Sequence, residues 1–174
     1  MDFRSLLTRF PSGMEKELYI RTVGDSEEKF LSLLDISIHD QDPLAWRAAW
    51  ILDGADEAWP GLASPHIPVI VEALPGLQSE GALRSLLRLL TRHEIPEEGQ
   101  GLLIDCCFSY LVSELYPVAV KVHAMQIIYN HVLIYPELKE ELVTVIEDQI
   151  HHNSAGFMSR GRRIIKQLEK IGES

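Results

Sequence analysis

The sequence predicts an all-α fold in which helix pairs stack into a right-handed α-α superhelix. A cation recurs at one interval, because Arg84 follows Arg47 by 37 residues and Lys121 follows Arg84 by 37 residues. Each of these cations comes directly after a large apolar residue. Self-similarity at a fixed period of this length is the signature of a repeat array. No segment alternates apolar and polar residues over the length of a strand, so we expect no β-sheet.

Two short helices should open the chain, over residues 2–10 and 14–23. Pro11-Ser12-Gly13 separates them and Gly24-Asp25 ends the second one, because proline and glycine are the strongest local breakers of a helix. Neither helix carries the 37-residue pattern. We expect both to be N-terminal capping helices, since the end of a stacked array must present a polar face to water.

About four helix pairs should follow, as part of one domain over residues 1–174. Most of these helices open at a serine, an aspartate or a proline, which are favoured at the N-cap and at the first helical position. No low-complexity stretch or linker interrupts the series. The helices are expected over residues 26–38 and 43–55, 64–74 and 79–93, 96–113 and 117–134, and 136–151 and 154–171.

The openings of the second helices resemble those of HEAT repeats. Asp42-Pro43-x-x-Trp46-Arg47-x-Ala49 is similar to the D-P-x-x-V-R-x-x-A pattern of that family, and the segment from Pro117 to Ala124 is similar to it as well. The resemblance covers residues 26–171, and the whole chain resembles short bacterial HEAT-like proteins. It implies an armadillo-like solenoid and a binding surface, because such arrays present extended concave faces to their partners.

The charge of the chain favours a protein partner over nucleic acid. The 174 residues include 26 acidic and 16 basic side chains, which gives a net charge of −10. A strongly acidic protein is repelled by polyanions unless a local basic patch overrides the mean field. We therefore expect a protein or peptide partner, and nucleic acid is disfavoured.

Cysteine content and hydropathy point to the cytoplasm. Cys106 and Cys107 are the two cysteines and are adjacent, so on a helix their side chains point about 100° apart and a disulfide between them is not expected. Isolated thiols fit a reducing compartment. The N-terminus lacks the apolar segment of a signal peptide, and no apolar run is long enough to cross a membrane. The oligomeric state stays open.

No motif indicates catalysis, a cofactor or a metal. The sequence contains no H-E-x-x-H, no C-x-x-C, no glycine-rich phosphate loop and no G-x-S-x-G. These patterns place metal ligands, phosphate-binding amides or a nucleophile at the spacing their chemistry needs. We therefore expect no catalytic, cofactor or metal site, and we predict that the protein is not an enzyme.

The repeated cations Arg47, Arg84 and Lys121 have two interpretations. As a surface row they would form a track for a polyanion, because second helices of adjacent repeats pack about 8–10 Å apart. As an internal ladder, each cation would be held by a nearby carboxylate. The nearby carboxylates are Asp42, Glu80 and Glu114. The resemblance to HEAT repeats favours the internal ladder, in which loss of Arg84 would leave a carboxylate unpaired.

Trp46, Trp50 and Asp53 form a second candidate site. They follow one another at helical spacings of four and three residues. HEAT-like DNA glycosylases hold damaged DNA with aromatic, acidic and basic side chains, and the same residue types occur here. Residues 24–60 carry nine acidic and two basic side chains, which is the wrong field for DNA. We favour the interpretation that the tryptophans lie in the core, because they can bury large apolar areas.

A basic cluster near the C-terminus is the third candidate. It could bind phosphate or an acidic partner, or it could be the solvated side of a last helix whose lysines lie favourably near the helix C-terminus. Its cations are Arg160, Arg162, Arg163, Lys166 and Lys170.

The predicted function is a non-enzymatic binding module or scaffold that recognises a protein or peptide on its concave face. The alternative is a nucleic-acid-binding or base-excision module of the HEAT-like DNA glycosylase kind. A third, weaker hypothesis is an enzyme whose site forms only in an oligomer. The charge of the concave face separates the first two hypotheses, because a continuous basic groove is needed for nucleic acid.

Overall fold

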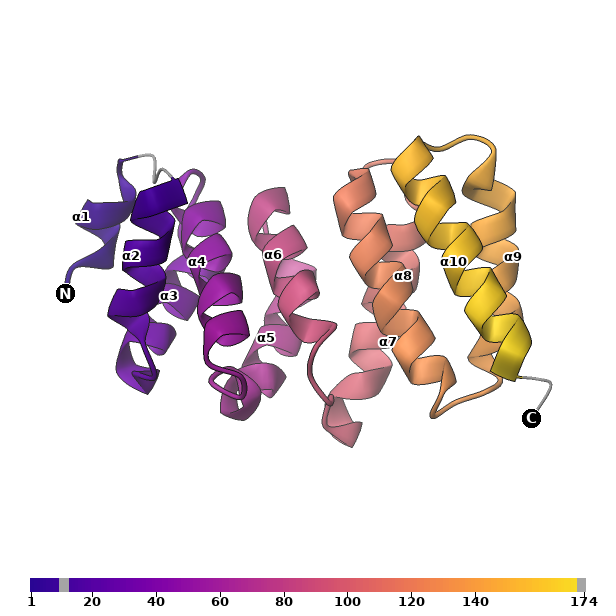
Figure 1. Cartoon of the computed structure of the whole chain (residues 1–174), viewed down its shortest axis with the longest axis horizontal. Coiled ribbons are helices and arrows are strands. Elements are labelled where there is room, and N and C mark those ends of the chain that lie inside the picture. The colour runs from indigo at the N-terminus through magenta and orange to yellow at the C-terminus, as the bar shows by residue number, and fades with distance from the viewer. Residues whose placement is uncertain (10–12, 172–174) are drawn as a thin grey trace. The chain divides into compact units, whose positions relative to one another are not determined.

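The computed structural model describes residues 1–9 and 13–171, and all regular secondary structure in these residues is helical (Figure 1). This confirms the predicted all-α, HEAT-like helical-repeat fold. The chain divides into two compact units, unit 1 over residues 1–99 and unit 2 over residues 100–174. The single domain expected over residues 1–174 stays a prediction, and each unit is described by itself.

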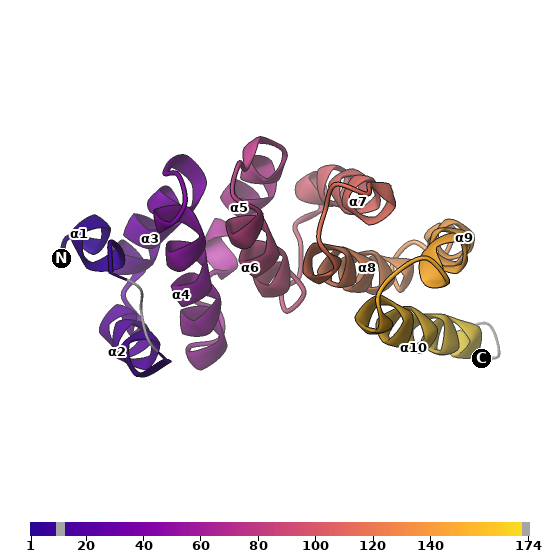
Figure 2. The same ribbon diagram turned by 90° about the horizontal axis from the view of Figure 1, so that it is seen from above.

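Unit 1 is built from two layers of helices. Seen from above, α3 and α5 lie in one layer and α2, α4 and α6 lie in the other (Figure 2). The central helix is α4, which packs against α1, α2, α3 and α6. The elements are α1 (Phe3–Leu7), α2 (Gly13–Val23), α3 (Glu27–His39), α4 (Leu44–Ala58), the 3-10 turn η1 (Ser64–His66), α5 (Ile67–Ala73), the 3-10 turn η2 (Leu74–Gly76) and α6 (Glu80–Leu90).

Side-chain caps set where several of these helices begin. Ser26 accepts a hydrogen bond from the backbone amide of Lys29, and Ser79 accepts one from the amide of Ala82, which satisfies amides that have no partner within the helix. Asp2 does the same at the start of α1. The first helix is expected to end at Phe10, which lies outside the described residues. Of the expected break, Pro11 and Ser12 also lie outside them, and Gly13 is the first residue of α2.

One predicted helix is broken into three pieces. The segment expected as a helix over residues 64–74 forms η1, then α5, then η2. Pro65, Pro68 and Pro75 explain the breaks, because proline has no amide hydrogen and its ring clashes with the preceding turn, so it is tolerated only in the first turn of a helix. Each of the three short elements accordingly has its proline at the first or second position.

Small residues let α4 approach its neighbours closely. A Cβ at Gly81 of α6 would lie 2.6 Å from the Cβ of Trp46, and a Cβ at Gly54 of α4 would lie 2.5 Å from Cδ1 of Ile20 on α2. The buried side of α4 is rich in alanine for the same reason. Its buried apolar residues are Ala45, Ala48, Ala49, Ile51, Leu52 and Ala55.

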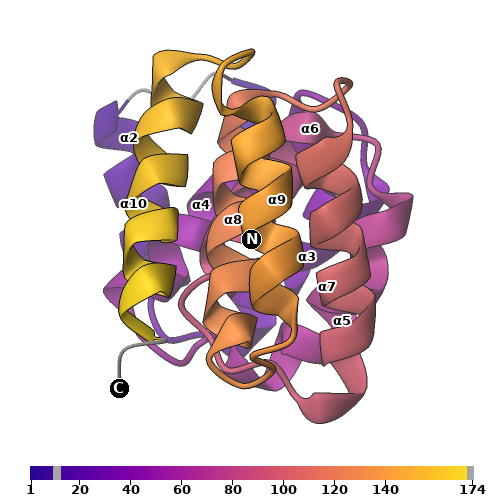
Figure 3. The ribbon, with the colours of Figure 1, turned by 90° about the vertical axis from the view of Figure 1, so that its right-hand side faces the viewer.

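Unit 2 consists of the antiparallel helix pairs α7–α8 and α9–α10 (Figure 3), and each of these helices buries apolar residues. The helix α8 packs against both α9 and α10. Cys107 is buried in α7 and Cys106 is partly exposed, and both are free thiols. The helices are α7 (Glu97–Val112), which begins within the last residues of unit 1, α8 (Val118–Val132), α9 (Leu138–Ile150) and α10 (Ala155–Ile171).

No described helix is both long enough and apolar enough to cross a membrane. None of them combines 18 or more residues with the apolar character that a bilayer crossing needs.

Replacing Gly81 by alanine should destabilise the protein, because the added methyl group must displace the Cβ of Trp46, which cannot move without its helix. We expect a loss of about 1–3 kcal/mol, the range for overpacking. Gly101 in α7 is the matched control, since a Cβ there meets nothing within 4 Å. Gly101→Ala should stabilise by about 0.5–1 kcal/mol through helix propensity. Urea denaturation measures both, and a neutral Gly81→Ala would contradict the close approach.

Candidate functional site

Two helices of unit 1 present a continuous set of aromatic and charged side chains. On α4, Trp46, Trp50, Asp53 and Glu57 follow one another at helical spacing, so they form one stripe. On α6, Arg84 and Arg88 form a second stripe one turn apart. Because α4 and α6 are in contact, the two stripes lie beside each other. We call these six residues the α4–α6 face.

The tryptophans of this face are partly exposed rather than buried in the core. Their ring centroids are 6.2 Å apart at an interplanar angle of 51°. Nζ of Lys16, on α2, lies 4.1 Å from the centroid of the Trp50 ring, which is a cation–π distance. Partial burial lowers the pKa of Lys16, while the charge of Asp53 opposes that shift. One side of each ring therefore packs against a neighbouring helix and part of it still meets solvent.

Asp53 is buried and forms ion pairs with two arginines, although its Oδ1 accepts no hydrogen bond. Its carboxylate pairs with Arg88 and with Nη2 of Arg92, the latter at 2.9 Å. Arg88 also reaches Glu57, with 3.1 Å between Nη2 and Oε1. The hydrogen bond that Arg88 donates to Asp53 raises the pKa of Arg88 above its usual value. These ion pairs neutralise the buried Asp53 carboxylate.

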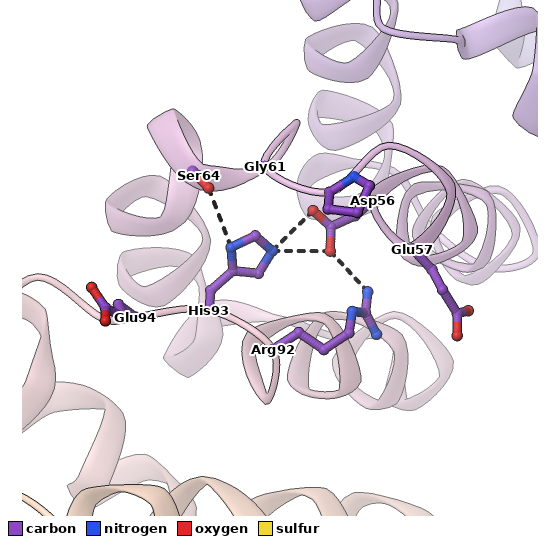
Figure 4. A pocket seen from close by; sticks show the side chains of 8 residues that line it. Asp56, Glu57, Gly61, Ser64, Arg92, His93 and Glu94 are labelled. Carbon is purple, nitrogen blue, oxygen red and sulfur yellow. Dashed lines mark hydrogen bonds and ion pairs between the residues drawn. The ribbon is translucent and has the colours of Figure 1, made fainter.

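A pocket of about 640 Å³ opens beside this cluster (Figure 4). Nε2 of His93 lies 2.9 Å from both oxygens of Asp56, and Nη2 of Arg92 lies 2.9 Å from Oδ2 of the same carboxylate. The backbone amide of Ala63 donates to Asp56 as well, at 3.3 Å. The pocket is lined by Asp56, Glu57, Pro60, Gly61, Ser64, Arg92, His93 and Glu94.

Burial and hydrogen bonding act on Asp56 in opposite directions. Burial raises the pKa of this carboxyl, but the hydrogen bonds and charges of His93 and Arg92 outweigh it and hold the pKa below its usual value. With an exposed fraction of 2%, the carboxylate depends on these partners, because an unpaired buried charge is costly. Asp56 is therefore the acceptor that links the end of α4 to the turn after α6.

Ser64, His93 and Asp56 are hydrogen-bonded in the sequence of a hydrolytic triad, but the backbone donors that a triad also needs are missing here. Oγ of Ser64 lies 3.4 Å from Nδ1 of His93, so the imidazole bridges the hydroxyl and the carboxylate. A triad also needs backbone amides that face a developing oxyanion. Here Pro65 has no amide hydrogen, the Ser64 amide donates to Gly61, and the Ala63 amide donates to Asp56. The group acts as a hydrogen-bonded link between η1 and α6.

Sequence reasoning found Asp53 but missed its partners and the pocket. The signal was present in the repeat period, because Asp56 and His93 are 37 residues apart and Asp53 and Arg88 are 35 residues apart. In a helical repeat, residues separated by about one period lie on adjacent equivalent helices. A search for opposite charges at that spacing would have found the cluster.

Arg47, the first of the repeated cations, binds a helix end rather than the carboxylate expected for it. Arg47 is 8% exposed, and its Nη1 donates to the carbonyl oxygens of Leu7 at 2.7 Å and of Thr8 at 3.0 Å, at the end of α1. These carbonyls have no partner within α1, so a buried guanidinium can satisfy them. Asp42, the expected partner, instead accepts from the amide of Trp46.

Lys121 occupies a similar position in unit 2. It is 4% exposed, and its Nζ donates to Oε1 of Gln149 at 3.0 Å, while Nε2 of Gln149 donates to the carbonyl of Leu111 at 2.9 Å, near the end of α7. Burial lowers the pKa of Lys121, and the charge of Glu114 opposes that shift. Lys121 therefore reaches a helix end through an amide side chain.

Arg84 differs from the other two cations. It is exposed on α6 and forms no hydrogen bond or ion pair with any residue in the described part of the chain. Glu80, the expected partner, is also exposed. The two repeated cations of unit 1 therefore differ in role. Arg47 is buried and structural, and Arg84 is exposed and belongs to the α4–α6 face.

The C-terminal cluster lies on α10. Arg160 is partly buried and donates from Nη1 to Oε1 of Gln126 on α8, at 3.1 Å. Arg162, Arg163 and Lys166 are exposed. Within residues 1–9 and 13–171, no group of three or more His, Cys, Asp or Glu side chains could hold a metal ion.

Arg47→Ala should destabilise the protein, because it leaves the buried Leu7 carbonyl without a donor. We expect a loss of about 1–3 kcal/mol, the cost of an unsatisfied buried polar group. Arg84→Ala is the matched control and should change stability by about 0.5 kcal/mol or less, as surface substitutions do. Urea denaturation of both variants tests this difference, and a larger loss in Arg84→Ala than in Arg47→Ala would contradict it.

The free energy of unfolding should fall in acid partly through Asp56. Because its pKa is lower in the folded state, Asp56 contributes stability that is fully present above its unfolded pKa of about 3.9 and is lost as the pH falls through the folded pKa. The difference in unfolding free energy between the parent and Asp56→Asn should therefore shrink between about pH 5 and pH 3. Glu80→Gln, at an exposed carboxylate, should show no such trend in urea denaturation. A difference for Asp56→Asn that stays constant would refute the assignment.

Comparison with known proteins agrees with this architecture. A family model described as a HEAT repeat domain matches residues 4–168. No curated protein and no solved structure matches the chain. Since the family model covers nearly the whole sequence, and the helices of both units follow the expected repeat pattern, the chain belongs to the HEAT repeat domain family.

Proposed function

We propose that the protein is a non-enzymatic scaffold that binds a protein or peptide on the α4–α6 face. HEAT repeat domains are helical-repeat scaffolds, often used for protein interaction and generally non-catalytic. Such arrays bind their partners on an extended surface made by equivalent helices of successive repeats. The helices α4 and α6 are second helices of their pairs, which supports this choice of face.

The observation that carries the proposal is a pair of partly exposed tryptophans next to an exposed arginine without a partner. Trp46 and Trp50 offer large, rigid apolar surfaces, and Arg84 offers five donors in a planar fork. Tryptophan and arginine are enriched among the residues that dominate binding energy at protein interfaces. A partner that fits this face carries an apolar side chain to cover the indoles and a carboxylate to pair with Arg84.

Two features count against the base-excision alternative. The Asp53 carboxylate is buried and paired with Arg88 and Arg92, so it cannot act on a substrate without breaking both ion pairs. The net charge of −10 also opposes a polyanion.

The free thiols at Cys106 and Cys107 fit a reducing compartment, and we place the proposed partner in the cytoplasm.

Photo-crosslinking tests the proposal directly. A benzoylphenylalanine introduced at Glu80, an exposed position on α6 beside the face, should form a protein adduct in native lysate. The same group at Leu31, which is 43% exposed on α3 in the other layer, should form much less. Equal yields at the two positions, or an adduct with nucleic acid at position 80, would contradict the proposal.

Charge reversal then identifies the side chain involved. Arg84→Glu should lower the yield of the adduct at position 80 by about tenfold, because it removes a candidate hot-spot residue and adds repulsion. Arg21→Glu, at an exposed cation on α2, is the matched control and should leave the yield unchanged. Since both residues are exposed, circular dichroism should show the same helix content in both variants.

A further inference from the structure

The last helix carries a second charged surface that the α4–α6 face does not include. Four cations of α10 fall within an arc of about 100° when successive residues are placed about 100° apart. The buried residues of α10 lie on the opposite side. We call the four cations the basic stripe, and they are Arg162, Arg163, Lys166 and Lys170, opposite Phe157, Gly161, Ile164 and Leu168.

None of the four cations pairs with another residue in the described part of the chain. All are exposed, and none forms a hydrogen bond or an ion pair with another described residue. Arg160 on the same helix is different, because it is partly buried and donates to Gln126. The adjacent helix α9, which packs against α10, carries four exposed acids, and none of them pairs with the stripe. These acids are Glu140, Glu141, Glu147 and Asp148.

Three arginines of unit 1, in contrast, pair with carboxylates of neighbouring helices. Arg4 pairs with Asp35 and Asp40, Arg88 with Asp53 and Glu57, and Arg92 with Asp53 and Asp56. A chain with ten more acidic than basic groups has carboxylates available to neutralise a basic helix. Among residues 1–9 and 13–171 the basic stripe nevertheless has no ion-pair partner, although the exposed Glu169 lies beside it on α10, so most of its charge can act on an external anion.

The overall negative charge does not cancel this local field. At physiological ionic strength, exposed charges farther apart than about 8 Å are largely screened from one another. A ligand that lies on α10 is therefore attracted mainly by the four cations it touches. The net charge of −10 acts only weakly at that distance.

From this geometry we infer that the basic stripe binds an acidic segment of a partner protein. Arg162, Lys166 and Lys170 are spaced by four residues each, which is a step of about 6 Å along the helix. Carboxylates four residues apart on an acidic helix have the same step, and those on alternate residues of an extended chain are about 7 Å apart. A run of aspartates or glutamates can therefore pair with the cations in register.

Nucleic acid is the weaker candidate for this surface. Proteins that bind single strands combine cations with exposed aromatic side chains on which the bases stack. The aromatic residue of α10 is Phe157, and it is fully buried. The stripe thus offers charge without a stacking platform, which suits carboxylates.

Fluorescence anisotropy with a labelled ten-residue glutamate peptide tests the inference at physiological ionic strength, where the net charge of the chain is screened. The parent protein should bind the peptide, and Arg162→Glu/Lys166→Glu should bind it about tenfold more weakly, because two attractive contacts become repulsive. The matched control is Arg9→Glu/Arg21→Glu, which lowers the net charge by the same amount at two exposed cations of unit 1. The control should bind like the parent. All four substituted residues are exposed, so folding should be unaffected, and circular dichroism checks this.

Three results would overturn the inference. The first is no binding of the peptide by the parent protein, and the second is an equal loss in both double variants. The third is tighter binding of duplex DNA, or of vesicles that contain phosphatidylserine, with the same sensitivity to Arg162→Glu/Lys166→Glu. None of these results bears on the α4–α6 face, because that proposal is tested by crosslinking in unit 1.

Discussion

Unit 1 depends on the contact between α4 and α6, where carboxylates of one repeat meet cations of the next. Asp53, Asp56 and Glu57 lie near the end of α4, and Arg88, Arg92 and His93 lie at the end of α6. Both the close packing of the two helices and the ion pairs between them favour one register. That register also brings Gly81 against Trp46 and places the tryptophans beside Arg84. The candidate binding face therefore depends on the register that this contact sets.

The order of helices could be predicted from the sequence because its determinants are local. Ser26 and Ser79 cap the helices that follow them, and the 37-residue period identified the stacking. The partners of the repeated cations could not be predicted. Arg47 binds carbonyl groups 39 and 40 residues earlier in the chain, and backbone carbonyls at a helix end have no signature in side-chain chemistry. The partial exposure of Trp46 and Trp50 likewise depends on how α2 and α6 flank α4, which the pattern of a single helix does not specify.

The two units use their charges in contrasting ways. In unit 1 most arginines hold helices together, and Arg84 is left free on a face that also offers aromatic surface. In unit 2 the buried cation Lys121 supports a helix end through Gln149, while the basic stripe of α10 has no internal partner. Two surfaces of different character follow, one suited to an apolar and acidic epitope and the other to a run of carboxylates. A scaffold with both could hold two partners, or two parts of one partner, at once.

The carboxylates of the ion-pair cluster do not recur one period later in the sequence. The positions 37 residues after Asp53 and Asp56 hold Leu90 and His93. The stiffness of a helical array depends on how strongly each helix–helix contact resists sliding. A contact held by buried ion pairs resists sliding more than a contact held by apolar side chains alone. Under tension, the contact between α4 and α6 should act as a stiff segment, and the bending of unit 1 should be concentrated at its other helix–helix contacts.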